Sequence, residues 1–113
     1  SKEIARSIDL ASAQSGISQS FLIALMYTES TGNPKAVSNL KYKGLMQIPW
    51  PVYYTDANMI IGAHIFNEKM RIANRNVEVA LCLYKGYPIG STRGLQQARK
   101  VLKLYDRLSE VSV

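Results

Sequence analysis

The chain of 113 residues has one cysteine and one histidine, which is too few for most disulfide and metal frameworks. Cys82 has no partner for an intrachain disulfide, and its apolar neighbours predict a buried, unreactive thiol. His64 has no second histidine or cysteine with which to build a metal site. No apolar run approaches the ~20 residues of a membrane-spanning helix. We therefore expect no metal, no cofactor and no membrane span.

Acidic residues are also scarce, with eight Asp and Glu against fourteen Lys and Arg and a net charge of +6. Such a chain attracts anionic partners, of which nucleic acid, acidic cell-wall polymers and membrane surfaces all qualify. The apolar content of 47% predicts a folded globular unit rather than disorder. We expect one domain over residues 1–113, monomeric as a domain, and either a processed product or a part of a larger protein or assembly.

The hydrophobic pattern predicts an all-α chain of about five to six helices, with at most a vestigial β-hairpin. Cap and turn residues predict where the elements begin and end. The expected boundaries are Ser15-Gly16 closing the first helix, Ser18 capping the second, Lys41-Tyr42-Lys43 as a short strand, Gly44 to Ile48 as one helical turn, Asp56 capping a long helix, Asn76 capping the next, and Ser91 or Thr92 opening the last.

The most informative stretch is a nearly all-apolar segment, Phe21 to Met26, that leads into Glu29 at the end of the second predicted helix. A helix that is hydrophobic on every face is expected to be buried. Burial disfavours the charged carboxylate and raises its pKa, which suits a general acid near neutral pH. A capping or surface glutamate is the alternative reading, although an anion at a helix C-terminus opposes the helix dipole.

Motifs around Glu29 resemble the catalytic core of soluble lytic transglycosylases. They are Glu29-Ser30, Asn33-Pro34, Ala36-Val37-Ser38 and Gly44-Leu45-Met46-Gln47. The resemblance continues from Gly16-Ile17-Ser18 through Asp56 to Ala63 and Val79 to Tyr84, and it ends at Val101 to Tyr105. Members of that family have a lysozyme-like fold, with helices around a glycan-binding cleft, and they cleave bacterial peptidoglycan. Glu-Ser followed by Gly-Leu-Met-Gln at this spacing is a specific signal, whereas either half alone is weak.

The resemblance implies roles for individual residues. Glu29 is implied as the single catalytic acid and base, which cleaves the bond between N-acetylmuramic acid and N-acetylglucosamine and leaves 1,6-anhydro ends. Tyr84 is implied as a hydrogen-bond partner of the Glu29 carboxyl. The substrate-binding residues implied by the same motifs are Ser38, Gly44, Met46, Gln47, Tyr84 and Lys85. Bacterial peptidoglycan glycan strands are the implied partner, and the reaction requires no metal or cofactor.

Two positions depart from the family pattern. Lys85 stands where the family has asparagine, and Pro49 stands where it usually has methionine or a similar apolar residue. For Lys85 three hypotheses stay open: its charge lowers the pKa of Glu29, it pairs with a carboxylate of the peptide stem, or it is a solvated lysine at a helix end. The loop after Gln47 is short, as in compact forms that phages or secretion and conjugation machines often carry.

Three other functions fit parts of the sequence. A goose-type lysozyme would hydrolyse the same bond, with Asp56 or no carboxylate orienting water, and a catalytically weak peptidoglycan-binding module would only bind. The segment from Leu10 to Leu25 also loosely fits a DNA-binding helix-turn-helix. However, Phe21 to Met26 lacks the polar face that a recognition helix needs, so we expect no specific nucleic-acid partner. The expected location is extracytoplasmic, in the periplasm or cell wall, or associated with a virion.

Overall fold

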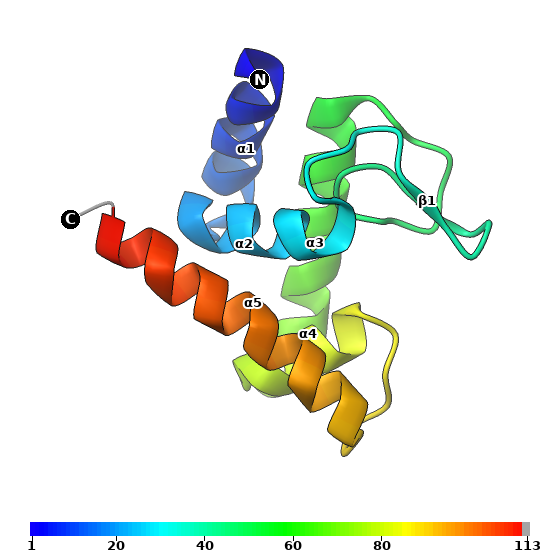
Figure 1. Ribbon diagram of the computed structural model, residues 1–113, viewed down its shortest axis with the longest axis vertical. Coiled ribbons are helices and arrows are strands. Elements are labelled where there is room, and N and C mark those ends of the chain that lie inside the picture. Colours follow the sequence, from blue (N-terminus) through cyan, green and yellow to red (C-terminus); the bar gives the residue numbers. More distant parts are fainter. Residues whose placement is uncertain (112–113) are drawn as a thin grey trace. The chain divides into compact units, whose positions relative to one another are not determined.

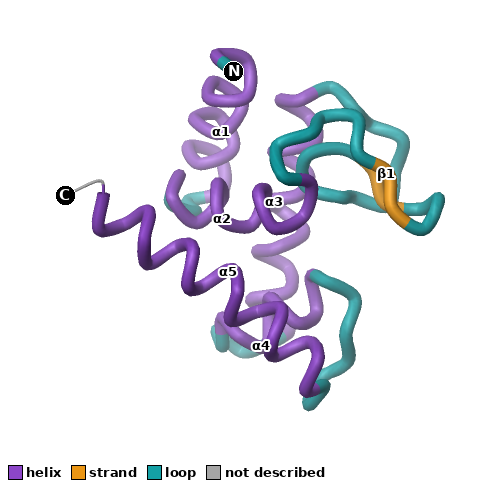
Figure 2. Tube along the Cα trace, viewed as in Figure 1, coloured by secondary structure: helices purple, strands orange, loops and turns teal. Residues whose placement is uncertain are grey.

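The computed structural model describes residues 1–111, and these are mostly helical (Figure 1). Five helices and one two-stranded antiparallel sheet are present in the described part of the chain, and Figure 2 shows how short the strands are beside the helices. The elements are α1 (Lys2–Ser15), α2 (Gln19–Ser30), β1 (Val37–Ser38), β2 (Tyr42–Lys43), α3 (Thr55–Ile72), α4 (Val77–Tyr84) and α5 (Thr92–Val111). The prediction of an all-α fold with a vestigial hairpin is confirmed.

The chain forms two compact units, of which the first covers Ser1–Ala63 and the second begins at His64. The first unit contains α1, α2, the hairpin and the N-terminal half of α3, while the second contains the rest of α3 with α4 and α5. α3 is thus one continuous helix that contributes to both units. None of the helices among residues 1–111 is both long enough and apolar enough to cross a membrane.

In the first unit, local signals set the ends of α1 and α2 as predicted. Gly16 closes α1 in the left-handed conformation, with φ 76°, and its N–H donates to the carbonyl of Ser12. The Ser18 hydroxyl accepts from the N–H of Phe21 at 3.2 Å and begins α2. The apolar segment of α2 from Phe21 to Met26 is almost wholly buried, as expected for a stretch of helix without a polar face. Its buried apolar side chains are Phe21, Leu22, Ala24, Leu25 and Met26.

The hairpin is minimal, with two residue pairs, Val37 with Lys43 and Ser38 with Tyr42. The predicted strand around Tyr42 is therefore confirmed, but the predicted helical turn from Gly44 to Ile48 is wrong. That segment is a non-helical turn whose end returns to β2 through a bridge between Lys43 and Ile48. Gly44 and Gln47 both have positive φ, of 80° and 52°, which a right-handed helix does not allow.

α3 begins one residue earlier than predicted, at Thr55, so Asp56 lies inside its first turn instead of capping it. The Asp56 carboxylate accepts a hydrogen bond from the hydroxyl of Ser7 on α1, which joins the N-terminal ends of the two helices. Ser7 and Thr55 are both buried, and their hydroxyls lie 2.9 Å apart. The N-terminal end of α3 is therefore held by side chains of α1.

In the second unit, the caps of α4 and α5 are those predicted. The Asn76 side chain accepts from the N–H of Val79 at 3.1 Å, and the Ser91 hydroxyl accepts from the N–H of Gly94 at 3.0 Å. A Cβ at Gly94 would approach the Cβ of Tyr87 to 2.7 Å, so glycine allows the start of α5 to pack closely on the chain that follows α4.

Candidate active site

Glu29 is the penultimate residue of α2 and is half-buried. The residue after it, Ser30, is buried, and its hydroxyl donates to the carbonyl of Met26 at 3.2 Å and accepts from the N–H of Gly32 at 3.2 Å. Thr31 then ends the helix in the left-handed conformation, with φ 52°. A non-glycine residue in that conformation is uncommon and needs support from its surroundings. The backbone that carries Glu29 is therefore fixed on the side where the chain leaves the helix.

The side chain of Gln47 forms hydrogen bonds to residues on both sides of the hairpin. Its Nε2 donates to the carbonyl oxygens of Ala36, at 3.1 Å, and Gly44, at 3.0 Å, and its Oε1 accepts from the hydroxyl of Ser38 at 2.5 Å. Both hydrogens of the amide are thus used, and the side chain is only 8% exposed. Gln47 and Ser38, two of the predicted substrate-binding residues, are in direct contact.

Asn58 on α3 is a structural residue of this region that sequence reasoning did not single out. Its Oδ1 accepts from the N–H of Met46 at 2.7 Å, and its Nδ2 donates to the carbonyls of Lys43, at 3.0 Å, and Val52, at 2.7 Å. The side chain is completely buried. An asparagine among the apolar positions of a helix was the available signal, because a buried amide needs partners.

Two glycines allow this packing around Met46, which is fully buried. A Cβ at Gly44 would lie 2.1 Å from the Nδ2 of Asn58, and a Cβ at Gly62 would lie 2.4 Å from the Cβ of Met46. Both distances are too short for any side chain. The close approach at Gly44 in this structure is thus made by Asn58, and a ligand at Gly44 stays a prediction.

Tyr84 and Lys85 lie in the second unit, where α4 ends. Tyr84 is the last residue of the helix, half-buried, with its ring centroid 6.3 Å from that of Phe66 on α3 and the rings inclined by 57°. Lys85 follows as the C-cap, also half-buried, and its N–H donates to the carbonyl of Leu81 at 3.0 Å. A cation at this position is favourable to the helix dipole. Both residues are held by the helix end on which they lie.

The four carboxylates of the first unit lie at different places in the fold. Glu29 is at the end of α2, and the other three accept hydrogen bonds from side chains of α1, α2 or α3. Those bonds join Glu3 to Thr55, Asp9 to Gln19 and Asp56 to Ser7. Within residues 1–111 no three His, Cys, Asp or Glu side chains gather where a metal ion would bind. At the end of α2, Glu29 therefore supplies the one carboxylate that could take part in acid–base chemistry.

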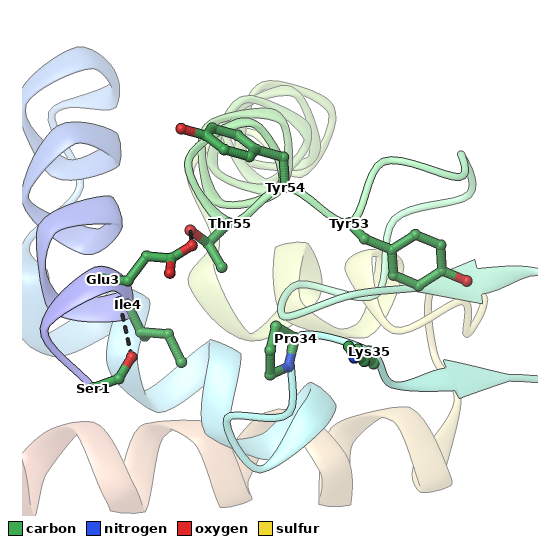
Figure 3. A pocket seen from close by; sticks show the side chains of 8 residues that line it. All are labelled: Ser1, Glu3, Ile4, Pro34, Lys35, Tyr53, Tyr54 and Thr55. Carbon is green, nitrogen blue, oxygen red and sulfur yellow. Dashed lines mark hydrogen bonds between the residues drawn. The ribbon is translucent and has the colours of Figure 1, made fainter.

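Two surface pockets lie apart from the predicted site residues. One, in the first unit, has a volume of about 210 Å³ and lies where α1 and α3 begin; its lining residues are Ser1, Glu3, Ile4, Pro34, Lys35, Tyr53, Tyr54 and Thr55. Figure 3 shows the rings of Tyr53 and Tyr54 pointing away from each other. The other, in the second unit, measures about 280 Å³ and is lined by Asn67, Met70, Arg71 and Arg75. Neither pocket contains Glu29.

The chain is mostly helical, has one short hairpin in its described part, and carries a glutamate at the end of a buried helix. These features are the ones expected of a protein with a lysozyme-like fold. Residues 6–104 match the family model of the transglycosylase SLT domain. The chain belongs to this family, and the resemblance drawn from the motifs is confirmed. No curated protein and no solved structure matches the chain. The family match supports a peptidoglycan-cleaving function of the lytic transglycosylase type.

Proposed function

We propose that this chain is a peptidoglycan lytic transglycosylase, in which Glu29 cleaves the β-1,4 bond between N-acetylmuramic acid and N-acetylglucosamine. The observation that carries the proposal is the fixed place of Glu29, half-buried at the end of α2, within the segment that matches the family. The substrate places the reaction outside the cytoplasm, in the periplasm, in the cell wall or at a virion that reaches the wall.

In the proposed reaction, the Glu29 carboxylic acid donates its proton to the bridging oxygen as the bond from that oxygen to the muramoyl C1 breaks. The resulting carboxylate then accepts the proton of the muramoyl C6 hydroxyl while O6 bonds to C1. This step closes a 1,6-anhydro ring and restores the protonated acid. Water is not consumed, so one carboxyl group serves in both steps.

The arrangement of the carboxylates supports this scheme over hydrolysis. Glycosidases that use water or a covalent intermediate generally need a second carboxylate across the bond. Asp56, the candidate for that role, accepts a hydrogen bond from Ser7 on α1 and lies in the first turn of α3. An acid engaged by a buried serine is poorly suited to orient water at another helix end.

The other site residues are proposed to act in two ways. Gln47 and Met46 act by position, because one is nearly and the other completely buried. The Gln47 side chain donates to backbone carbonyls, and the Met46 N–H donates to the Asn58 side chain. Ser38 is exposed and is the hairpin residue best able to meet a glycan. Tyr84 and Lys85 are proposed as substrate-binding residues because they occupy the third motif of the family.

The test is Glu29→Gln, measured by mass spectrometry of purified peptidoglycan after digestion. The amide keeps the shape of the side chain but has no proton to donate, and general acid catalysis typically contributes about 10²- to 10⁴-fold. Glu110→Gln is the matched control, because it removes the same charge from an exposed position on α5. We expect the control to release 1,6-anhydro-muropeptides at the wild-type rate and Glu29→Gln to release almost none.

Other outcomes would select other functions. Products with reducing ends, each heavier by one water, would indicate a hydrolase of the goose-type lysozyme class. Binding of the wild type to peptidoglycan without any product would indicate a binding module. Equal rates for the wild type and Glu29→Gln would remove Glu29 from the mechanism.

We also propose that residues 1–113 work as one domain despite their two compact units. The family match runs through both units, and α3 is continuous where they meet. A single cooperative unfolding transition, with the same midpoint by fluorescence of Trp50 and by helical circular dichroism, is the expected result.

A further inference from the structure

The positive charge of the chain is concentrated in the second unit. Nine Lys and Arg and four Asp and Glu follow residue 63, so this part carries +5 of the net charge of +6. The first unit, with five basic and four acidic residues, is nearly neutral. The general attraction to anions that the composition predicts therefore has a definite location.

The long C-terminal helix α5 is labelled in Figure 1, and four of these cations form a stripe along it. Arg93, Lys100, Lys103 and Arg107 are all exposed. At about 100° per residue their positions fall within about 80° of one another around the helix axis. At ~1.5 Å per residue the stripe is about 21 Å long. Gln96 lies within it, and Glu110 lies just beyond its end.

These four cations form no ion pairs within the described part of the chain, whereas Arg99 beside them does. Arg99 on the flank of the stripe pairs with Glu78 of α4, with 3.2 Å between Nε and Oε2. On α3, Arg71 pairs in the same way with Glu68. The four stripe residues form no comparable pair, so their charges face solvent together and reinforce one another.

The opposite face of α5 is occupied, which decides the kind of partner. Ala98 and Val101 are completely buried, and α5 packs against α4. An amphipathic helix that inserts into a bilayer must present its apolar face to lipid. Here Ala98 and Val101 on that face are buried within the protein, whereas the four cations of the stripe are exposed, and a straight row of cations matches a linear polyanion better than a lipid surface.

We infer that the α5 stripe binds an anionic phosphodiester polymer of the cell wall. The choice of wall polymer over nucleic acid rests on the proposed function, which places the chain outside the cytoplasm. The stripe would hold the domain on walls rich in such polymers while the peptidoglycan beneath them is cleaved. Because four cations contact phosphates, the logarithm of the binding constant should fall with the logarithm of salt concentration with a slope of about −3, by analogy with single strands.

The test is binding of fluorescently labelled poly(glycerol phosphate) as a function of salt, with a variant and a control of the same composition. Lys103→Gln with Arg107→Gln removes two stripe cations four residues apart. Lys2→Gln with Arg6→Gln removes one lysine and one arginine, also four residues apart and exposed, from α1. We expect the α5 pair to reduce the salt slope by about 1.4 and the affinity at 0.1 M salt by about 25-fold. The α1 pair should change the affinity less than about twofold, because neither residue belongs to the α5 stripe to which the inference assigns the phosphate contacts.

Equal losses in the two double variants would show that net charge alone binds the polymer, and the inference would be overturned. It would also be overturned if phosphatidylglycerol vesicles or double-stranded DNA bound through the same residues more tightly than the polymer. Repeating the titration with Glu29→Gln separates the inference from the proposed function, because binding should persist without lysis. On peptidoglycan stripped of its anionic polymers, the α5 pair should cleave at the wild-type rate, and on intact walls it should cleave more slowly.

Discussion

Asn58→Ala should destabilise the chain far more than an ordinary asparagine substitution does. The side chain is completely buried and makes three hydrogen bonds to backbone groups between residues 43 and 52. The carbonyl of Lys43 keeps a second partner, the N–H of Ile48 at 3.0 Å, and the substitution removes the bonds that join Asn58 to the N–H of Met46 and to the carbonyl of Val52. An unsatisfied buried group costs about 1–3 kcal/mol. Because Val52 is only half-buried and water can replace part of its bond, we expect a loss of about 2–4 kcal/mol in total.

The assay is equilibrium unfolding in urea at neutral pH, compared with Asn33→Ala. Asn33 is exposed and accepts one hydrogen bond, from the N–H of Lys35 at 2.9 Å, so its loss should be about 1 kcal/mol. The two variants remove the same atoms and differ in burial and in the number of bonds. A loss for Asn58→Ala no larger than that for Asn33→Ala would refute the reasoning.

Asn58→Asp tests the separate contributions of the Oδ1 acceptor and the Nδ2 donor of the side chain. The carboxylate keeps an acceptor for Met46 but faces the carbonyl oxygens of Lys43 and Val52 without a hydrogen to donate. Burial and these oxygens should raise the pKa of the introduced carboxyl above its ordinary value of about 3.9. With a folded-state pKa above the unfolded value, the stability of this variant should be greatest in acid and should decrease as pH rises through the raised pKa.

Two further predictions concern the second unit. On the hypothesis that the Lys85 charge favours the ionised form of Glu29, Lys85→Asn should move the pH optimum of peptidoglycan cleavage toward alkaline pH. A weaker apparent affinity for peptidoglycan with an unchanged pH profile would instead support pairing of Lys85 with the peptide stem. No change in either the affinity or the pH profile would leave Lys85 as a surface charge. Burial raises the pKa of the Cys82 thiol, and the nearby Glu78 carboxylate raises it further, so iodoacetamide should alkylate the native protein slowly even at pH 8 and the urea-unfolded protein quickly. Equal alkylation rates in the two states would contradict the buried, protonated thiol.

The parts of the fold that local chemistry decides were predictable from the sequence. Gly16, Ser18 and Asn76 end or begin helices through contacts within four residues, so their identities suffice. Asp56 was wrongly predicted as a cap because the residue before it, Thr55, is already helical. The hydrogen-bond partner of the Asp56 carboxylate is Ser7, which is 49 residues away in the sequence. Sequence periodicity carries no information on such a distance.

The same reason explains the error after the hairpin. The residues from 44 to 48 look like a helical turn, but bonds to groups outside the segment hold them in another conformation. Asn58 accepts from the N–H of Met46, and the Gln47 side chain bonds to Ala36 and Ser38. Glu29 could be selected as the candidate acid because an apolar helix that ends in a glutamate is visible in one segment, and its catalytic role stays a prediction. Gln47 was selected only through the family motif and Asn58 was given no role, since the sequence does not show which groups a buried amide bonds to.

The side-chain amides around the hairpin also bear on the order in which the chain folds. Two strand pairs are too few to stabilise a hairpin in water, so residues 43–52 depend on Asn58. Its bonds span 12, 15 and 6 residues, and the closure of such loops must precede the gain from the bonds. We therefore expect the hairpin to become ordered with the first turns of α3 and not before them. During synthesis, α2 with Glu29 emerges first, and its surroundings become complete only once the residues around Asn58 have followed.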